Sequence, residues 1–255
     1  MRGPGSLNHN RRSFTAENVD PERSSLNVVY RDEPIQKVYH ELFDDAVGRY
    51  NAKQKRKDRC ISDYYEHLRT GKQEKVFHEL IVQIGNKDDM GVLTENGALA
   101  KKLLDEYMQG FQERNPTLRV FGAFLHMDEA TPHLHIDFVP YVSGWKGKGL
   151  DTKVSLKQAL KALGFAGGSK RESELNQWIN AEKEQLARVM ERHGIEWEQK
   201  GTHEEHLSVL DFKKQERSKE VAALEAVKQE CQTDLTEMQE QLETVQTAVD
   251  AAEQR

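Results

Sequence analysis

The chain has 255 residues, of which 36% are hydrophobic and 31% charged, and its mean hydropathy is −0.81. This length fits one medium-sized domain plus an extension, and no apolar run approaches the length that spans a bilayer. The segment Met1–Asn10 is polar and glycine-rich, unlike a secretory signal. The two cysteines, Cys60 and Cys231, match neither a disulfide nor a metal-binding spacing. We therefore expect a cytoplasmic protein with no membrane span.

The net charge of −6 is unevenly distributed along the chain. Residues 220–255 contain nine acidic and two basic residues, which leaves residues 1–219 with a net charge of +1. Five cations lie between Lys53 and Arg59. Such a cluster favours phosphate binding, although a solvated helix face explains a short basic run equally well. We select three of these residues as candidate DNA contacts: Lys55, Arg56 and Lys57.

The first part of the chain predicts a mixture of strands and helices. Residues 1–25 are rich in turn-forming residues and predict an irregular segment. A strand is expected over 26–30, followed by a helix with Pro34 in its first turn. A second, strongly charged helix is expected to run through the basic cluster toward Leu68. Residues 76–84 alternate in polarity and predict a buried strand.

The middle of the chain predicts a helix, a strand hairpin and a further helical region. Thr94 is a helix cap, and the apolar spacing after it continues to about Pro116. Residues 118–125 and 133–141 read as two strands joined by a short polar turn. Residues 154–193 are charged and mostly helical, with a glycine-rich break. The fold class is therefore α+β, an antiparallel sheet with flanking helices.

The end of the chain has the clearest periodicity and predicts a coiled coil. Nine of ten heptad core positions are apolar or small. The a positions are Val221, Lys228, Leu235, Leu242 and Val249, and the d positions are Leu224, Cys231, Met238, Val245 and Ala252. We expect a domain over 1–210, then a coiled-coil extension over 211–255 that continues in the natural chain and forms a homodimer. An isolated charged helix is the alternative.

Three histidines within ten residues form the strongest chemical signal. Alternate side chains of a strand share a face, so His133 and His135 point the same way. His126, at the end of the preceding strand, can turn toward that face across the short loop. Three converging imidazoles leave coordination positions open, as in a catalytic metal site. We expect one divalent ion, Mn²⁺ or Mg²⁺, although imidazole also suits zinc, iron, cobalt and nickel.

Other interpretations of this segment are weaker. Ordinary half-buried strand histidines are the simplest alternative, but three of them bracketed by Asp128 and Glu129 make it a weak one. The spacing is not that of a His-Glu-x-x-His metalloprotease helix. Asp137 continues the same strand face. Three roles are open for it: a fourth ligand, a hydrogen-bond partner of a ligand, or a solvated side chain.

Two motifs in this order resemble those of a known family. The run H-x-D-E-x-x-P-H-x-H-x-x-x-V-P over 126–140 is similar to the metal motif of the MobV-type (Mob/Pre) plasmid mobilisation relaxases, which belong to the HUH endonuclease group. Upstream, H-N-x-R over 9–12 and N-x-D-x-x-R-x-x-x-N over 18–27 resemble the first motif of that family. The resemblance extends over residues 9 to about 210.

The resemblance implies a fold and an activity. Relaxases of this group have a five-stranded antiparallel sheet with helices behind it and the two-histidine strand at its centre. The implied reaction is metal-dependent nicking of one strand at an origin of transfer, through a covalent 5′-phosphoryl enzyme and a free 3′-OH. The implied partners are single-stranded or hairpin origin DNA and a conjugation machinery.

The resemblance also implies roles for individual residues. In the MobV-type branch the histidine of the H-N-x-R motif attacks the phosphate. In this chain that histidine is His9. Glu129 is the candidate acceptor that fixes its tautomer. Arg12 and Arg23 would steady phosphate oxygens. The remaining motif residues, Asn10 and Asn27, are further candidate DNA contacts.

The chain departs from the family pattern before His9. The pattern expects a strand there, whereas Met1–Asn8 is short and rich in glycine and proline. We therefore expect either that a first strand is missing or that the sheet is completed differently.

Two other functions compete with the relaxase hypothesis. An HUH replication initiator or transposase would use a tyrosine, for which Tyr30, Tyr64 and Tyr65 are candidates. Such enzymes place it on a helix after the metal motif, but residues 142–255 contain no tyrosine. A non-catalytic DNA-binding adaptor would dimerise through the coiled coil and use the histidines for a structural metal.

Overall fold

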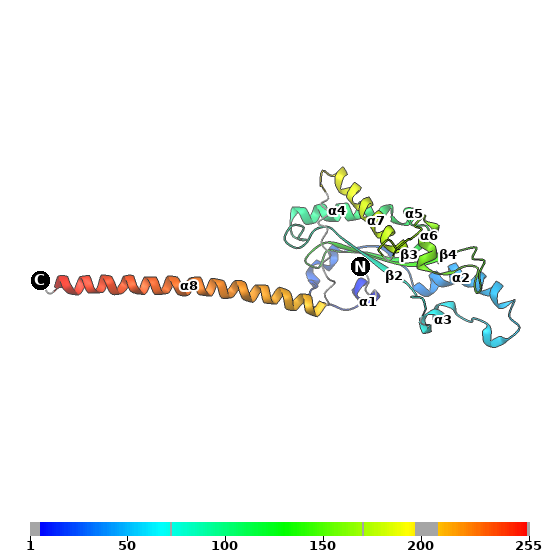
Figure 1. The fold of residues 1–255 in the computed structure, drawn as a ribbon, viewed down its shortest axis with the longest axis horizontal. Coiled ribbons are helices and arrows are strands. Elements are labelled where there is room, and N and C mark those ends of the chain that lie inside the picture. Colours follow the sequence, from blue (N-terminus) through cyan, green and yellow to red (C-terminus); the bar gives the residue numbers. More distant parts are fainter. Residues whose placement is uncertain (1–5, 72, 170, 197–208, 254–255) are drawn as a thin grey trace. The chain divides into compact units, whose positions relative to one another are not determined.

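The computed structural model describes residues 6–71, 73–169, 171–196 and 209–253 (Figure 1). The chain divides into two compact units, Met1–Trp197 and Glu198–Arg255. The first unit contains the sheet, the predicted site residues and most of the helices, whereas the second contains one long helix.

A five-stranded antiparallel sheet forms the centre of the first unit. Four strands lie in the order β1-β3-β4-β2, and β5 pairs with β4. The bounds are β1 Val28–Asp32, β2 His78–Gln83, β3 Leu118–His126, β4 His133–Val142 and β5 Lys153–Val154. The predicted strands and the hairpin of β3 with β4 are confirmed, and the strand with two histidines lies between two neighbours.

Helices flank this sheet, as the sequence predicts. Their bounds are α1 Leu7–Asn10, α2 Ile35–Asn51, α3 Tyr64–Thr70, α4 Glu95–Gln109, α5 Phe111–Arg114, α6 Leu156–Ala162 and α7 Glu174–Arg192, with short 3₁₀ segments η1 Pro21–Leu26 and η2 Lys57–Arg59. The predicted cap is confirmed, because the Thr94 side chain accepts a hydrogen bond from Gly97 N. The helix that follows is interrupted at Gly110, and α5 begins at Phe111.

The two faces of the sheet are covered differently. Helices α4–α7 pack on one face, where residues such as Leu134, Ile136 and Phe138 of β4 join the larger apolar core. The opposite face carries the alternate residues of β4. Helices α2 and α3 cover part of it around Val139, and the rest faces the segment that contains α1. The part of the face next to α1 carries the predicted site.

Two sequence predictions about local structure are corrected. Residues 7–26 are not wholly irregular, because His9 lies on the one-turn helix α1 and η1 follows it. The basic cluster is not part of a long helix. Helix α2 ends at Asn51, whose side-chain amide bonds both Ile61 N and Ile61 O at 2.8 and 2.7 Å and so closes a loop around the cluster.

The second unit contains the helix α8, Val209–Glu253. Apolar side chains at predicted heptad core positions are exposed along it, among them Leu224, Leu235, Met238 and Leu242. The helix is therefore confirmed, and its pairing into a coiled coil stays a prediction. Among the described residues, no helix is long and apolar enough to cross a membrane.

Candidate metal and nucleic-acid site

Strand register brings three of the predicted histidines together. His126, at the end of β3, pairs directly with His133, at the start of β4, and His135 follows on the same face. The centroids of the three rings lie 4.6–5.2 Å apart. His126 therefore reaches the other two across the strand pair, without folding back over the loop.

Helix α1 adds a fourth histidine to this group. The His9 ring lies 5.5 Å from the rings of both His126 and His135. Among the described residues, His9, His126, His133 and His135 each offer one ligand atom, and these atoms all lie within 4.8 Å of one another. The cluster could therefore hold a metal ion.

The hydrogen bonds of the three strand histidines indicate which ring nitrogens are free. His126 Nε2 lies 3.0 Å from the carbonyl of Asn10, and His133 Nδ1 lies 2.8 Å from that of Thr131. His135 Nδ1 lies 2.7 Å from Glu79 Oε1. Carbonyl and carboxylate oxygens only accept, so these nitrogens carry the protons. The opposite nitrogens then have lone pairs, and those of His126 and His135 are buried without a partner.

Burial keeps two of these imidazoles, His126 and His133, neutral. Burial lowers the pKa of His126 to about 3. Burial, together with the charge of His135, also lowers the pKa of His133. A neutral imidazole is the form that binds a metal. The orphaned nitrogens, their neutral state and the close spacing therefore all fit a metal ion bound by histidine nitrogen.

Arg12 connects the short helix α1 to the turn between β3 and β4. Its Nε and Nη2 donate to the two carboxylate oxygens of Asp128 at 3.0 and 2.6 Å, and Nη2 also donates to Glu129 Oε1 at 2.8 Å. Its Nη1 lies 3.2 Å from His9 Nε2. Arg12 has a φ of 53°, a left-handed conformation that is uncommon outside glycine. The guanidinium thus joins both carboxylates to His9.

Glu129 lies among the histidines. Its Oε1 is 3.4 Å from His9 Nε2 and 3.7 Å from His133 Nε2, and its Oε2 accepts from Asn18 Nδ2 at 2.6 Å. Burial alone would raise the pKa of Glu129, but the interactions with His9, His133 and Arg12 outweigh it and lower the pKa to about 2. The carboxylate is therefore ionised at neutral pH.

A second polar network lies beneath the histidines. Asn10 Nδ2 donates to Glu79 Oε1 at 2.9 Å and to Asp137 Oδ2 at 2.8 Å. Burial raises the pKa of Asp137 to about 7, with a further contribution from the charge of Glu79. Gly122 pairs with Asp137 in the sheet, and a Cβ at Gly122 would lie 3.0 Å from Asp137 Oδ2. The close approach therefore favours glycine.

Three residues expected to contact DNA are engaged with protein groups. Asn10 is 2% exposed, which leaves it almost no surface for DNA. Asn27 donates to Asp128 and accepts from Met127 N at 2.6 Å. Arg23 donates to Asp20 and to the Glu129 carbonyl. These contacts hold the loop and α1 in place, and contact of the three side chains with DNA stays a prediction.

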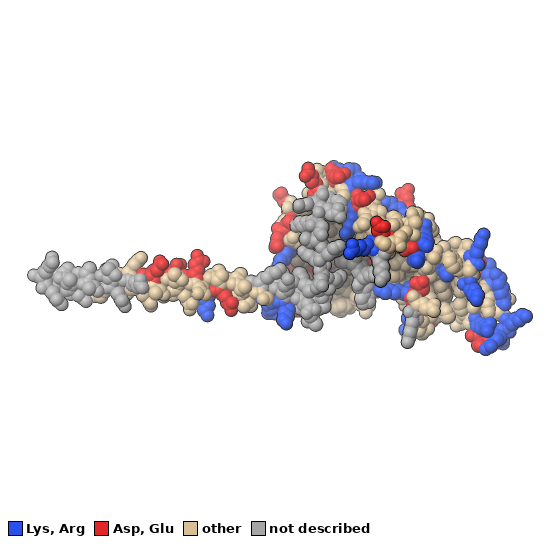
Figure 2. Space-filling model, viewed as in Figure 1, with Lys and Arg blue, Asp and Glu red and all other residues tan. Residues whose placement is uncertain are grey.

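The basic cluster lies apart from the histidines. It follows α2, and Figure 2 shows lysine and arginine gathered at the end of the first unit, where Figure 1 places α2 and α3. Within the cluster Arg56 pairs with Asp58. Asp151 pairs with Arg49 at 2.7 Å, which links the end of α2 to a second lysine-containing loop, residues 143–152.

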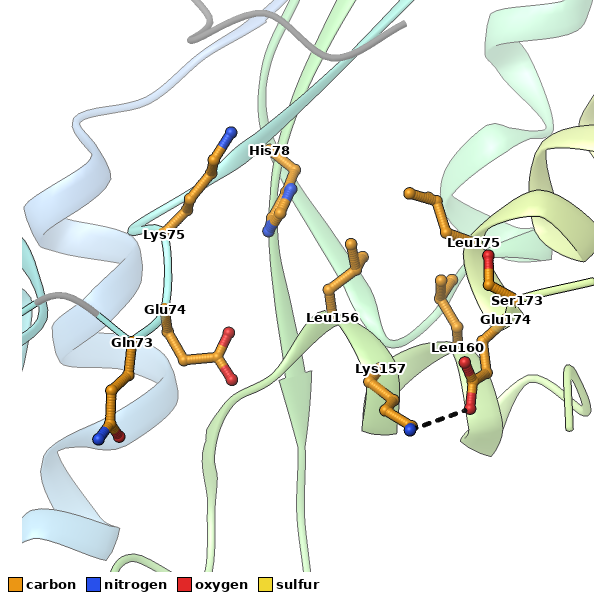
Figure 3. A pocket seen from close by; sticks show the side chains of 10 residues that line it. All are labelled: Gln73, Glu74, Lys75, His78, Leu156, Lys157, Leu160, Ser173, Glu174 and Leu175. Carbon is orange, nitrogen blue, oxygen red and sulfur yellow. Dashed lines mark ion pairs between the residues drawn. The ribbon is translucent and has the colours of Figure 1, made fainter. Parts of the chain in front are cut away.

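A cavity of about 350 Å³ lies elsewhere in the first unit. Figure 3 shows it between the segment before β2, helix α6 and the start of α7. His78 lines it and stacks on Phe138 of the larger core, so it projects from the sheet face opposite to that of His135. The ion pair of Lys157 with Glu174 stands at one side. The cavity is separate from the histidine cluster.

Sequence reasoning missed Glu79 and treated Asp128 only as a flanking charge. The signal for Glu79 was a carboxylate directly before the apolar run Leu80–Val82 of a strand, which is unusual unless the carboxylate has a partner. For Asp128, burial would raise the pKa, but hydrogen bonds from Arg12, Asn27 and Ser24 lower it well below its usual range. Its partners come from the H-N-x-R and N-x-D motifs, so the two motifs meet at this carboxylate.

Known proteins resemble the chain in sequence and in structure. A plasmid recombination enzyme of Streptococcus agalactiae is 24% identical over 218 residues, which cover 82% of this chain and 36% of the relative. One from a Bacillus species is 25% identical over 224 residues, covering 85% of this chain and 44% of the relative. The chain thus spans less than half the length of these relatives.

Among solved structures, the MobM relaxase domain (MOBV; Mob_Pre) bound to plasmid pMV158 oriT DNA, a Mn-bound crystal structure, is 24% identical. It covers 81% of this chain and 89% of the other, with a TM-score of 0.46. A second Mn-bound structure of that domain gives a TM-score of 0.48 at 22% identity, over 83% and 90% of the two chains. The Mob_Pre family model, plasmid recombination enzyme, matches residues 30–214. Because this match extends over well more than half of the chain, the chain belongs to the Mob_Pre family of plasmid recombination enzymes.

Proposed function

We propose that the chain nicks one DNA strand at the origin of transfer of a plasmid or other mobile element and becomes covalently attached to the 5′ end. One observation carries the proposal. Three buried histidines bring ring nitrogens within 4.8 Å of one another, and His9 lies beside them, partly exposed. The Mob_Pre family and the oriT DNA named for the similar relaxase structures support DNA as the substrate.

His126, His133 and His135 would hold one divalent ion. When bound, the ion supplies Lewis-acid chemistry at a phosphate oxygen and orients the phosphate for attack. Manganese is the first ion to test, because it is named for the similar relaxase structures. The ligands are neutral imidazoles, which manganese accepts along with other divalent metals.

His9 is the proposed nucleophile. Glu129 Oε1 lies 3.4 Å from His9 Nε2 and offers an acceptor for an N–H there, while Arg12 Nη1 lies 3.4 Å from the opposite nitrogen, Nδ1. With the proton on Nε2, Nδ1 keeps the lone pair that attacks. A bond forms between the His9 nitrogen and phosphorus as the bond to the 3′-oxygen breaks. The 3′-oxygen leaves as a hydroxyl group after taking a proton from solvent. The phosphoramidate keeps the strand attached and allows later rejoining.

Arg12 is the proposed organiser of this site. Its guanidinium is 14% exposed and already bonds Asp128 and Glu129, so it places both carboxylates relative to His9. A planar guanidinium held in this way stays directed toward the site and can donate a hydrogen bond to a phosphate oxygen with little reorganisation.

A tyrosine nucleophile is a weaker alternative. Tyr64 is buried with its hydroxyl bonded to Val154 N, and Tyr30 donates to Asp105. Tyr65 packs edge-on against Tyr39 in the smaller core. These contacts leave each of the three candidates engaged away from the histidines.

The proposal includes two further interaction surfaces. Lys55, Arg56 and Lys57 would bind phosphates of the same DNA away from the cut, where exposed cations favour a polyanion. Helix α8 would pair with that of a second copy through its exposed apolar heptad positions, which gain by burial. Its acidic charge disfavours DNA, so its proposed role is assembly.

Docking to a conjugation machinery would follow nicking.

A nicking assay tests the proposed function. A supercoiled plasmid that carries DNA flanking the encoding gene should be converted to the open circle in Mn²⁺ and not in chelator. His135→Ala should abolish conversion, because it removes one of three ligands. His40→Ala is the matched control, since His40 is exposed on α2 and pairs with Asp44. Nicking that persists in His135→Ala would support another enzyme class, whereas DNA binding without nicking by the parent would support the non-catalytic adaptor.

A further inference from the structure

Phe14 stands out among the aromatic side chains of the protein. Within the part of the chain whose burial is described, every other Phe, Tyr or Trp side chain is buried or half-buried, whereas Phe14 is 51% exposed. Its ring centroid lies 6.5 Å from that of His9. A single exposed apolar residue is ordinary, but an exposed ring beside the histidine cluster is not explained by packing.

The backbone around Phe14 is held at both ends. Ser13 N donates to Asn8 O at 2.8 Å, which closes the turn after α1. At the far end, Asn18 Nδ2 donates to Glu129. Arg12, within the turn that the Ser13–Asn8 bond closes, has a left-handed φ of 53°. Backbone conformations of this kind cost energy in residues other than glycine and occur often at functional sites. The result is a ring presented at the edge of the site by a fixed loop.

We infer that Phe14 is a stacking platform for an unpaired nucleobase of the DNA strand held at the histidine cluster, next to the phosphate to be cut. This inference rests on the proposed function, because it takes single-stranded DNA as the ligand. An exposed aromatic face stacks on any base, and such contacts place single-stranded DNA without reading its sequence. A base fixed on Phe14 would set where the adjoining phosphate lies relative to His9, which is 6.5 Å away between ring centroids.

The face of the ring also suits this ligand better than a protein partner. Arg12 and the histidines form a polar, phosphate-directed surface beside it, so an apolar group and a phosphate-binding group lie side by side. This combination matches a nucleotide, which has a flat base and a charged phosphate.

Binding of two oligonucleotide probes tests the inference. One is a labelled oligodeoxythymidine, and the other is the abasic strand of the same length, which retains the phosphates and lacks the bases. Phe14→Ala should weaken binding of oligodeoxythymidine by about five-fold to a hundred-fold. It should leave binding of the abasic strand unchanged, because the lost contact is with a base. Phe14→Trp should keep or increase the affinity for oligodeoxythymidine, and Phe14→Leu should recover only part of it.

Leu93→Ala is the matched control, because Leu93 is an apolar side chain with 84% exposure and no aromatic face. The Mn²⁺ content and melting temperature of each variant should equal those of the parent, which separates stacking from a structural role. Equal losses in Phe14→Ala and Leu93→Ala, or equal losses on both probes, would contradict the inference and leave the proposed function standing. If the parent binds neither probe, the proposed function fails as well.

Discussion

The carboxylate of Glu79 lies 2.7 Å from Nδ1 of His135, and both side chains are buried. A carboxylate in this position fixes the ring orientation and raises the basicity of the opposite nitrogen, Nε2. The same Glu79 oxygen accepts from Asn10, next to His9. One residue of β2 thereby connects a strand histidine to the helix that carries the proposed nucleophile.

Glu79→Ala is therefore expected to weaken Mn²⁺ binding. The loss of an orienting partner typically costs 10- to 100-fold in metal affinity, and Glu79→Gln should lose less because its amide oxygen still accepts. Calorimetric titration of Mn²⁺ into chelator-treated protein measures the change. Glu113→Ala, at an exposed position of α5, is the control. Unchanged affinity in a folded Glu79→Ala protein would show that His135 needs no such partner.

Salt dependence tests the basic cluster. Arg56 is already paired with Asp58, so Lys55 and Lys57 are the cations to neutralise. The Lys55→Gln, Lys57→Gln double variant should reduce the slope of log K against log salt by about 0.7 per lost contact on single strands and about 0.9 on duplex. Lys101→Gln, Lys102→Gln on α4 is the control. An unaltered slope in the first variant would mean that these lysines face only solvent.

Acid should weaken the link between β1 and β3. Arg119 Nη2 lies 2.7 Å from Glu33 Oε2. Burial would raise the pKa of Glu33, but Arg119 outweighs it and lowers the pKa below 4.5. A carboxylate whose pKa is lower in the folded than in the unfolded state stabilises the folded protein at pH values above the unfolded-state pKa. This stabilisation is lost as the pH falls through the folded-state pKa.

Glu33→Gln should therefore lower the free energy of unfolding at pH 7 by roughly 1 kcal/mol or less, since the pair is partly exposed. The difference from the parent should shrink as the pH falls through 4.5 and below. Urea denaturation at a series of pH values measures it, with Glu113→Gln as the control. A difference that grows toward acid would reverse the assigned sign.

Assembly through α8 can be tested by point changes. Leu235 and Leu242 occupy a positions and are exposed in the single chain. Changing both to Glu should convert a dimer to a monomer in sedimentation experiments, because a charge in the seam opposes burial. Thr236→Glu, on another side of the helix, should leave the dimer intact. A dimer that survives both leucine changes would place the interface elsewhere.

Cys231 reports the orientation of the same pair. It is exposed and occupies a d position, so in a parallel pair it would face its twin. Mild oxidant should then give a crosslinked dimer, whereas an antiparallel pair would crosslink poorly.

Much of the fold could be predicted because local patterns and tertiary contacts agree. The β3–β4 hairpin and the cap at Thr94 follow from alternation and side-chain chemistry alone. The basic cluster could not be placed, because α2 ends before it at Asn51, whose side chain bonds Ile61 ten residues later. The charged residues of the cluster predicted a helix face, but in the structure the cluster lies in a loop, because contacts within the fold override such a local preference.

The sequence indicated which residues form the candidate site, but it indicated few of their hydrogen-bond partners. Strand alternation placed His133 and His135 together, and the motif order indicated His9 and Glu129. The partners of Asn10 and Arg23 depend on contacts across about a hundred residues of sequence or more, such as Asn10 with Asp137 and Arg23 with the Glu129 carbonyl. No local pattern encodes such pairs. That is why side chains expected on DNA were found anchoring the loop.

The most direct measurement is chemical identification of the residue that becomes attached to DNA. Single-stranded DNA from the region flanking the encoding gene is mixed with the protein in Mn²⁺, and the digested adduct is mapped by mass spectrometry. We expect an acid-labile phosphoramidate on His9, absent in His9→Gln, because a nitrogen–phosphorus bond hydrolyses in acid. An acid-stable adduct on Tyr30, Tyr64 or Tyr65, or nicking without any adduct, would contradict the account.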